Sequence, residues 1–228
     1  LILVGTFLFE AAGAVLLSFY FCPLLGIWKG IYFGIFHSVS AFCNAGFDLM
    51  GAVAPDSSLI SVSGNLYVNL VIIALIIIGG LGFLVWADIR QSKFRFRRFR
   101  LHTQVVLTVT ALLIALGTVL IFLLEQSGTM FADKGVGEQW LVSLFQSVTF
   151  RTAGYATVPL SEMTPQSKVV SILLMLIGGS PGSTAGGMKT TTFAVLICSV
   201  YATFRQRKSV ELFRRRINGD ILQTVVSI

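Results

Sequence analysis

Long apolar stretches that are almost free of charge constrain this chain more than any other feature. Leu66 to Ala87 and Val105 to Leu124 contain no charged residue, and Leu1 to Phe21 contains only Glu10. A membrane-spanning helix needs about 20 mostly apolar residues, so each stretch is long enough to cross a bilayer. Only 12% of the residues are charged, against about 25% in soluble domains. The sequence therefore predicts an all-α integral membrane protein.

Basic residues gather in two runs that follow apolar stretches. Arg90 to Arg100 and Arg205 to Arg216 hold six Lys and Arg each, which is 12 of the 17 in the chain. Nucleic-acid binding is one interpretation of such runs. The positive-inside rule explains them better, because each run comes after a long apolar segment. We therefore expect both runs on the cytoplasmic side, and no nucleic-acid partner.

Two further apolar segments contain shorter hydrophobic runs, of about three or four helical turns each. They cover Gly30 to Met50 and Glu138 to Val158, and each runs into a polar–Ala–Gly–aromatic sequence. Segments this short are more often re-entrant than spanning. Re-entry of the second is also what keeps both basic runs on one side. The predicted domains are a helix–pore loop–helix repeat in residues 1–88, a basic linker in 89–103, a second repeat in 104–204, and a basic segment with the start of a further repeat in 205–228.

A glycine-rich interruption divides the apolar stretch from Val169 to Phe204. Five of the ten residues from Gly178 to Gly187 are glycine. The spacing resembles a phosphate-binding P-loop, but Met188 stands where that motif needs lysine. Irregular backbone at membrane depth is tolerated where it lines a cavity or is buried in protein. We expect a gating loop here, with a nucleotide loop and a passive kink as the alternatives.

The two short segments have the chemistry of a cation filter. Glycine permits backbone angles that turn a carbonyl toward an axis, and rings of carbonyls can replace the hydration shell of a cation. A helix that ends at the loop also directs its negative dipole end into the pore. The candidate filter residues are Cys43, Asn44, Ala45, Gly46 and Phe47, and Arg151, Thr152, Ala153, Gly154 and Tyr155.

Four motifs in this order carry a family resemblance. The stretches "FHSVSAFCNAGFDLM", "GGLGFLVWADI", "QSVTFRTAGY" and "GGSPGSTAGGMKTTTF" resemble the second and third of four repeats in the Trk/Ktr/HKT potassium transporter superfamily, in its TrkH/KtrB (NtpJ-type) membrane subunits. The resemblance implies four helix–pore loop–helix repeats around one ion pore, and we expect this chain to be a fragment that holds two of them. It implies potassium at the carbonyls of Asn44, Gly46, Thr152 and Gly154.

The resemblance also implies a function and partners. We expect potassium uptake across a bacterial cell membrane by a multi-pass protein that is not an enzyme, with potassium as transported substrate and no covalent cofactor. A sodium-selective or sodium-coupled transporter of the same architecture is the alternative. Expected partners are membrane lipid, a second copy in a homodimer and a cytosolic nucleotide-binding regulatory subunit. The expected gating loop comprises Gly178, Gly179, Ser180, Pro181, Gly182, Ser183, Thr184, Ala185, Gly186 and Gly187, with Lys189 following.

Two cations near these motifs need a separate explanation. Arg151 directly precedes the second filter triplet. We expect it behind the filter, bonded to carbonyls or to Glu138 or Glu162, or else at the extracellular mouth. Lys189 follows the gating loop at membrane depth, where charge is costly and usually functional. It is expected to repel potassium in the closed state, to pair with a dimer partner, or to extend toward the cytoplasm.

Overall fold

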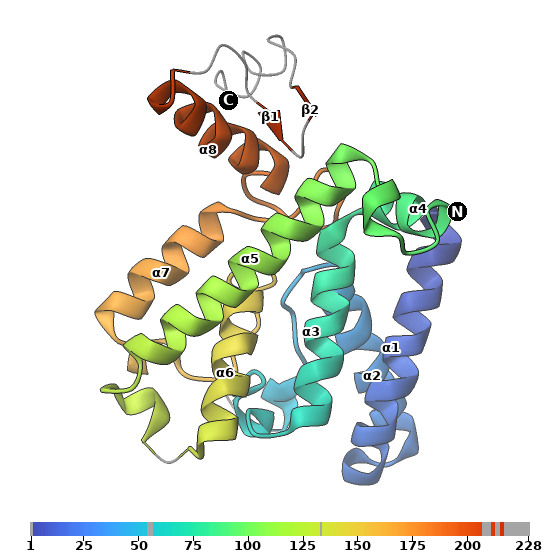
Figure 1. Ribbon diagram of the computed structural model, residues 1–228. Helices are drawn as coiled ribbons and strands as arrows, with labels where there is room; N and C mark the ends of the chain where they lie inside the picture. Colours follow the sequence, from blue (N-terminus) through green and yellow to red (C-terminus); the bar gives the residue numbers. More distant parts are fainter. Residues whose placement is uncertain (1, 54–56, 133, 207–210, 213–214, 217–228) are drawn as a thin grey trace.

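The computed structural model describes residues 2–53, 57–132, 134–206, 211–212 and 215–216, and its architecture is all-α, as predicted (Figure 1). The α-helices are α1 (Ile2–Leu25), α2 (Ile27–Phe42), α3 (Leu66–Leu81), α4 (Phe83–Gln91), α5 (Leu101–Leu124), α6 (Val136–Thr149), α7 (Pro165–Leu176) and α8 (Thr190–Phe204). Short 3₁₀ helices are η1 (Met50–Ala52), η2 (Ile60–Val62), η3 (Phe96–Arg98), η4 (Thr129–Phe131) and η5 (Leu160–Glu162). Two-residue strands β1 (Glu211–Leu212) and β2 (Arg215–Arg216) pair antiparallel.

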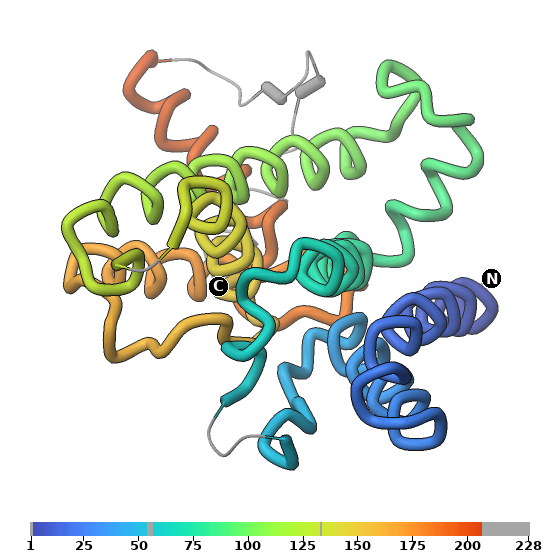
Figure 2. Tube along the Cα trace, turned by 90° about the horizontal axis from the view of Figure 1, so that it is seen from below, coloured from blue at the N-terminus to red at the C-terminus, as the bar shows by residue number. Residues whose placement is uncertain are grey.

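Two units of three helices make up the body of the molecule. The first unit is α1, α2 and α3, and the second is α5, α6 and α7. In each unit the first helix packs along the second, and α3 touches both α2 and α6, so that it joins the two units. Figure 2 shows α3 end-on between the α1–α2 pair and the α5–α6 pair.

Within each unit, equivalent contacts join the first helix to the second. Ser38 Oγ of α2 donates to the Glu10 carbonyl oxygen of α1 at 2.7 Å, and Ser147 Oγ of α6 donates to the Ile114 carbonyl oxygen of α5 at 2.9 Å. In both units a glycine lies beside that serine hydroxyl, with a leucine of the third helix against it. The matching sets are Glu10, Gly13, Ser38 and Leu75, and Ile114, Gly117, Ser147 and Leu174. The units are therefore alike in packing as well as in helix order.

The second helix of each unit is short. α2 has 16 residues and α6 has 14, which at 1.5 Å per residue gives about 24 Å and about 21 Å. The apolar core of a bilayer is about 30 Å thick, so neither helix is long enough to cross it. By length and composition α1 and α5 can each span a membrane, and α3 with α4 would add a third span if the bent pair counts as one.

The third helix of the first unit differs from the prediction. The stretch from Leu66 to Ala87 was expected to be one membrane-spanning helix, but α3 ends at Leu81 and α4 departs from it at 91°. Gly82 makes the bend with φ of +85°, a backbone conformation open mainly to glycine. The Phe83 N–H after the bend donates to the Gly182 carbonyl oxygen at 3.1 Å. A contact distant in the sequence therefore fixes the break.

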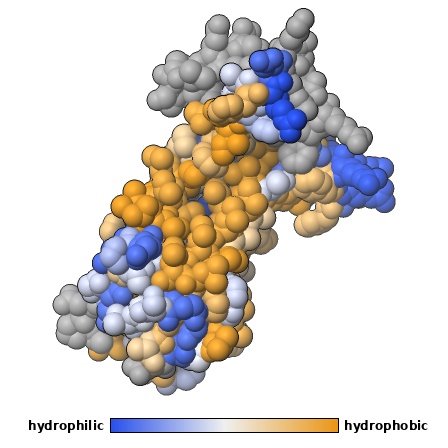
Figure 3. All heavy atoms as spheres, turned by 60° about the vertical axis from the view of Figure 1, so that its left-hand side comes forward, coloured by the Kyte–Doolittle hydropathy of each residue, from blue (hydrophilic) through white to orange (hydrophobic). Residues whose placement is uncertain are grey.

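The surface agrees with a membrane environment. Figure 3 shows an apolar band between more hydrophilic ends on one face of the molecule. Exposed apolar side chains on α5 and α7 include Leu116, Leu120, Leu123, Val169, Ile172, Leu173 and Leu176. The α4–α5 corner and the end of α8 lie at one end of the molecule, the top of Figure 1. The predicted basic segment 205–228 lies largely outside the described residues, which include only 205–206 and the two short strands.

Candidate ion-conduction site

Two loops of like backbone follow the short helices. We call residues 43–47, after α2, the first loop and residues 151–155, after α6, the second loop. In the first loop φ is +51° at Asn44 and +71° at Gly46. In the second it is +75° at Thr152 and +94° at Gly154. Left-handed residues thus alternate in the same way in both triplets, and Asn and Thr accept this costly conformation only when their surroundings hold them in it.

The carbonyl groups of both triplets are left without donors. The Ala45 N–H donates back to the Ser40 carbonyl oxygen at 2.9 Å, and the Ala153 N–H donates to the Thr149 carbonyl oxygen at 2.9 Å. Among the described residues, no donor reaches the carbonyl oxygens of residues 44–46 or 152–154. Such oxygens, placed at the C-terminal ends of two helices, are suited to a cation.

The two loops touch backbone to backbone. A Cβ added at Gly46 would lie 2.3 Å from the Ala153 carbonyl oxygen and 2.8 Å from the Gly154 Cα. No side chain fits at such distances, so the close approach of the loops requires glycine at this position. The structure therefore brings the two candidate triplets together from residues more than 100 positions apart in the sequence.

A hydroxyl group anchors the far end of each loop. Ser40 Oγ donates to the Phe47 carbonyl oxygen at 2.7 Å, and Thr149 Oγ1 donates to the Tyr155 carbonyl oxygen at 2.7 Å. Both hydroxyl residues are buried. Sequence reasoning missed them, although a Ser or Thr six or seven residues before the aromatic residue of each motif was a usable signal.

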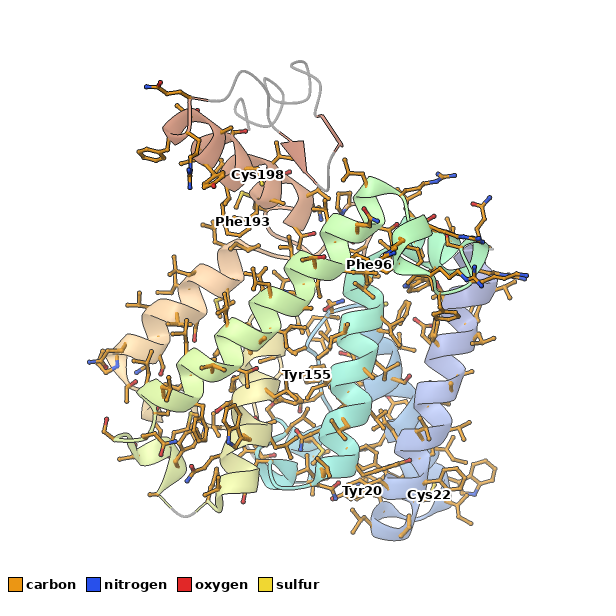
Figure 4. All side chains as sticks on the ribbon, in the orientation of Figure 1. Tyr20, Cys22, Phe96, Tyr155, Phe193 and Cys198 are labelled. Carbon is orange, nitrogen blue, oxygen red and sulfur yellow. The ribbon has the colours of Figure 1, made fainter. Side chains whose placement is uncertain are left out.

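Buried aromatic groups support the loops from behind. Tyr155 is 2% exposed, lies near the centre of the molecule in Figure 4, and its hydroxyl is 3.4 Å from the His37 carbonyl oxygen. The ring of His37 accepts from the Leu49 N–H at 3.3 Å through Nε2, and Nδ1 donates to the Phe33 carbonyl oxygen at 2.8 Å. These contacts connect the second loop to the helix that carries the first.

The glycine-rich segment, residues 177–189, contacts both loops. Asn44 Nδ2 donates to Thr184 Oγ1 at 2.8 Å, and that hydroxyl donates to the Phe42 carbonyl oxygen at 2.9 Å. On the other side, the Gly186 N–H donates to Thr152 Oγ1 at 3.1 Å. The segment therefore lies against the first left-handed residue of each triplet.

The same segment is attached to the end of α3. The Ser180 N–H donates to the Gly80 carbonyl oxygen at 3.0 Å, and Ser180 Oγ also contacts the Leu81 carbonyl oxygen. The Thr184 N–H donates to the Gly79 carbonyl oxygen at 3.4 Å. Because α3 ends at the bend, its last carbonyl groups have no N–H donor within the helix. The glycine-rich segment supplies donors to them.

Comparison with known proteins gives the family. The model of the family described as "TrkH: Cation transport protein" matches residues 1–228. This chain belongs to the TrkH family. It is 44% identical over 208 residues to the Potassium/sodium uptake protein NtpJ of Enterococcus hirae, covering 91% of this chain and 45% of that protein. It is 38% identical over 221 residues to the Ktr system potassium uptake protein B of Vibrio alginolyticus, covering 96% and 48%.

A solved structure has the same fold. The potassium transporter TrkH of Vibrio parahaemolyticus matches with a TM-score of 0.73 at 19% identity, over 96% of this chain and 45% of that one. The chain thus spans about half the length of the curated relatives and of this structure. Family membership, together with the apolar helices, makes this TrkH chain part of a membrane protein.

In this TrkH chain Arg151 is buried but lacks the expected partners. It is 6% exposed, which rules out the surface position at the mouth. Its side chain makes no hydrogen bond or ion pair in the part of the chain that the structure describes, and Glu138 pairs instead with Lys134 at 3.5 Å. Arg151 lines a cavity of about 10 Å³ together with Asn44 and Ala185. The predicted pairing with Glu138 or Glu162 is therefore wrong.

Lys189 has a local partner. Its Nζ donates to the Ala185 carbonyl oxygen at 2.9 Å, so the side chain turns back onto the glycine-rich segment. The Gly178 N–H donates to the Met188 carbonyl oxygen at 3.1 Å, and the Met188 N–H donates to the Leu176 carbonyl oxygen at 3.0 Å. Lys189 thus closes one end of a segment that is already tied together by its own backbone, instead of extending toward the cytoplasm.

Proposed function

We propose that this chain forms two of the pore repeats of a subunit that takes up potassium across the cell membrane. The carbonyl oxygens of Asn44, Gly46, Thr152 and Gly154 replace water molecules around the potassium ion. Carbonyl groups from the rest of the protein complete the ring of ligands. The observation that carries the proposal is the pair of touching loops whose triplet carbonyls have no donor among the described residues. Carbonyls left free at membrane depth need a partner, and a dehydrated cation is one.

The glycine-rich segment is the gate in this proposal. It lies against Asn44 and Thr152 through hydrogen bonds of 2.8 and 3.1 Å, so an ion that leaves the filter on this side meets it. Opening then requires these contacts to break while the attachment of the filter loops to their helices persists. A gate held by few neutral hydrogen bonds opens at a cost of a few kcal/mol, since each contributes about 1 kcal/mol.

The names of two relatives support a further subunit. The Vibrio alginolyticus and Bacillus subtilis proteins are each described as Ktr system potassium uptake protein B, a name that implies a system of several components. We infer a homodimer in the lipid bilayer that is regulated by a cytosolic nucleotide-binding subunit. Sodium is the second candidate ion, because the Enterococcus hirae relative is described as a potassium/sodium uptake protein.

Deleting Gly182 to Gly186 tests filter and gate together. The deletion shortens the obstruction and leaves residues 43–47 and 151–155 unchanged, so rubidium uptake should rise at matched membrane expression. It should be measured in the intact transporter, with and without its regulatory subunit, and with sodium as competitor. Uptake equal to or below the parent in well-folded protein would contradict the gate. Uptake that rises without preference for rubidium over sodium would contradict the potassium filter instead.

A further inference from the structure

The corner between α4 and α5 has an unusual backbone. α4 ends at Gln91, and Lys93 and Phe94 follow with φ of +49° and +59°. The Phe94 N–H donates to the Ile89 carbonyl oxygen at 3.3 Å, and the Arg95 N–H donates to the Ser92 carbonyl oxygen at 3.2 Å. Consecutive left-handed residues other than glycine are strained. Here Lys93 and Phe94 reverse the direction of the chain. As a result, Lys93 near the start of the linker and Arg98 and Arg100 near its end line one hollow.

Basic side chains surround that hollow. The corner carries six cations, all exposed, and none of them forms an ion pair in the described part of the chain, where Lys134 and Glu138 form one. Figure 4 shows side chains that end in nitrogen projecting from this corner, close to the label of Phe96. The hollow has a volume of about 420 Å³ and is lined by Asp88, Gln91, Ser92, Lys93, Arg98 and Arg100. This volume lies within the range of small-molecule pockets.

The single acid in the hollow is already occupied. Asp88 is 6% exposed, and its Oδ2 accepts from the Arg100 N–H at 2.9 Å while Oδ1 accepts from Ser92 Oγ at 3.4 Å. The carboxylate therefore caps the start of α5, where a negative charge is stabilising. The Arg100 side-chain charge also interacts with this carboxylate, whereas Lys93 and Arg98 form no ion pair among the described residues and can receive an external anion.

Apolar groups beside the hollow place it at a membrane surface. Phe94 is 84% exposed and Leu84 is 61% exposed. α4 runs at 91° to α3, so it lies along the bilayer surface if α3 lies along the bilayer normal. A helix in this orientation with basic and aromatic neighbours is typical of the lipid interface. The corner also begins α5, which is long enough to span a membrane.

We propose that this hollow binds the phosphate group of an anionic phospholipid of the cytoplasmic leaflet. Arginine forms bidentate hydrogen bonds with phosphate, basic pockets at the ends of membrane helices bind lipid head groups, and Phe94 would enter the acyl region beside them. The preference of basic loops for the cytoplasmic side would explain the charge alone. It would not explain the hollow, the hydrogen-bonded Asp88 carboxylate or the exposed Phe94. These three features favour a lipid over the acidic face of a protein partner.

Two double variants of equal charge test the site. R98Q/R100Q removes two arginines that line the hollow, and R95Q/R97Q removes two from the same linker that do not line it. The intact transporter would be purified from membranes, and its binding to phosphatidylglycerol in phosphatidylcholine nanodiscs measured by native mass spectrometry. We expect R98Q/R100Q to weaken binding by about tenfold or more, as for loss of a charge-assisted hydrogen bond, and R95Q/R97Q to weaken it by about twofold.

Other outcomes of the same experiment would contradict the lipid site. Equal losses in the two variants would mean diffuse attraction without a site and would overturn the proposal. It would likewise fail if R98Q/R100Q kept its lipid and lost only the regulatory subunit, because the hollow would then be a protein-docking surface. Inorganic phosphate is added as a competitor. Displacement of the lipid at equal concentration would mean that the hollow takes free phosphate, whereas retention supports the lipid.

Discussion

In the first unit the third helix turns through 91° at a single residue, Gly82, whereas in the second unit it is interrupted from Ile177 to Lys189 before α8 begins. The rest of the two units is packed alike, down to the serine that bonds a carbonyl of the first helix. The longer interruption lies against the shorter one, since residues 180–184 bond to residues 79–81. The packing of the helices is thus the same in both units, and the units differ mainly where the third helix breaks.

The loops differ in charge rather than in backbone. Arg151 is buried before the second triplet, and the matching residue of the first loop is the exposed Cys43. Cys43 Sγ lies 3.8 Å from a carboxylate oxygen of Glu10, and the residue of α5 that corresponds to Glu10 is Ile114. The two loops therefore have similar backbone geometry but different charged neighbours: Glu10 near the first loop and Arg151 at the second. This asymmetry makes it informative to change each loop separately.

The largest effect is expected at the glycines of the triplets. Gly46→Ser places a Cβ 2.3 Å from the Ala153 carbonyl oxygen, whereas at Gly154 the nearest atom is 3.4 Å away. Both positions have positive φ, which costs a residue with a side chain about 1–2 kcal/mol. We expect both variants to lose preference for rubidium over sodium, by about tenfold at Gly154 and by more at Gly46. Competitive uptake into proteoliposomes measures it.

Gly51 provides the control for this pair. It lies in η1, has no positive φ, and an added Cβ would meet nothing within 4 Å. Gly51→Ser should leave ion preference at the parent value. Equal preference in the parent and in Gly46→Ser would rule out the first loop as part of the filter.

A smaller effect is expected at the contact between the glycine-rich segment and the first loop. Thr184→Val removes the hydroxyl that bonds both Asn44 and the Phe42 carbonyl oxygen. Each bond contributes about 0.5 kcal/mol or more, so loss of both should raise uptake by about fivefold or more as the closed state is weakened. The neighbouring Ser183 has a buried hydroxyl without a protein partner, and Ser183→Ala should leave uptake unchanged. A folded Thr184→Val protein with parental uptake would show that this contact does not hold the gate.

How far the sequence could anticipate this structure depends on the range of the contacts. Short apolar runs before the polar–Ala–Gly–aromatic motifs predicted two half-helices. α2 ends at Phe42, immediately before the first loop, and α6 ends at Thr149, with one residue between it and the second loop. The glycine cluster predicted where the last apolar stretch breaks, and the break lies at 177–189. Both signals are local. Length and composition set them, without knowledge of what packs against the segment.

The misses came from contacts distant in the sequence. Leu66 to Ala87 is uncharged and apolar throughout, so nothing local marks Gly82 as a sharp bend. The bend depends on carbonyl and hydroxyl groups near residue 181. Arg151 was expected to bond to carbonyls or to Glu138 or Glu162, or to lie at the mouth, yet in the described residues its side chain is buried and bonds to none of these groups.

The smallest effect is expected where the hydroxyl groups anchor the loops, and here the two loops should respond almost alike. Thr149→Val and Ser40→Ala each remove one hydrogen bond to the carbonyl of the aromatic residue, at 2.7 Å in both cases. Loss of one such bond costs about 1 kcal/mol, so we expect a lower melting temperature and about a two- to fivefold loss of ion preference in each. Thr149→Ser keeps the hydroxyl and should restore the parent values. Thr110→Val is the matched control, because its hydroxyl is also buried but has no hydrogen-bond partner among the described residues. A loss of preference in Thr110→Val as large as in Thr149→Val would mean that helix packing, and not the anchor, sets the filter.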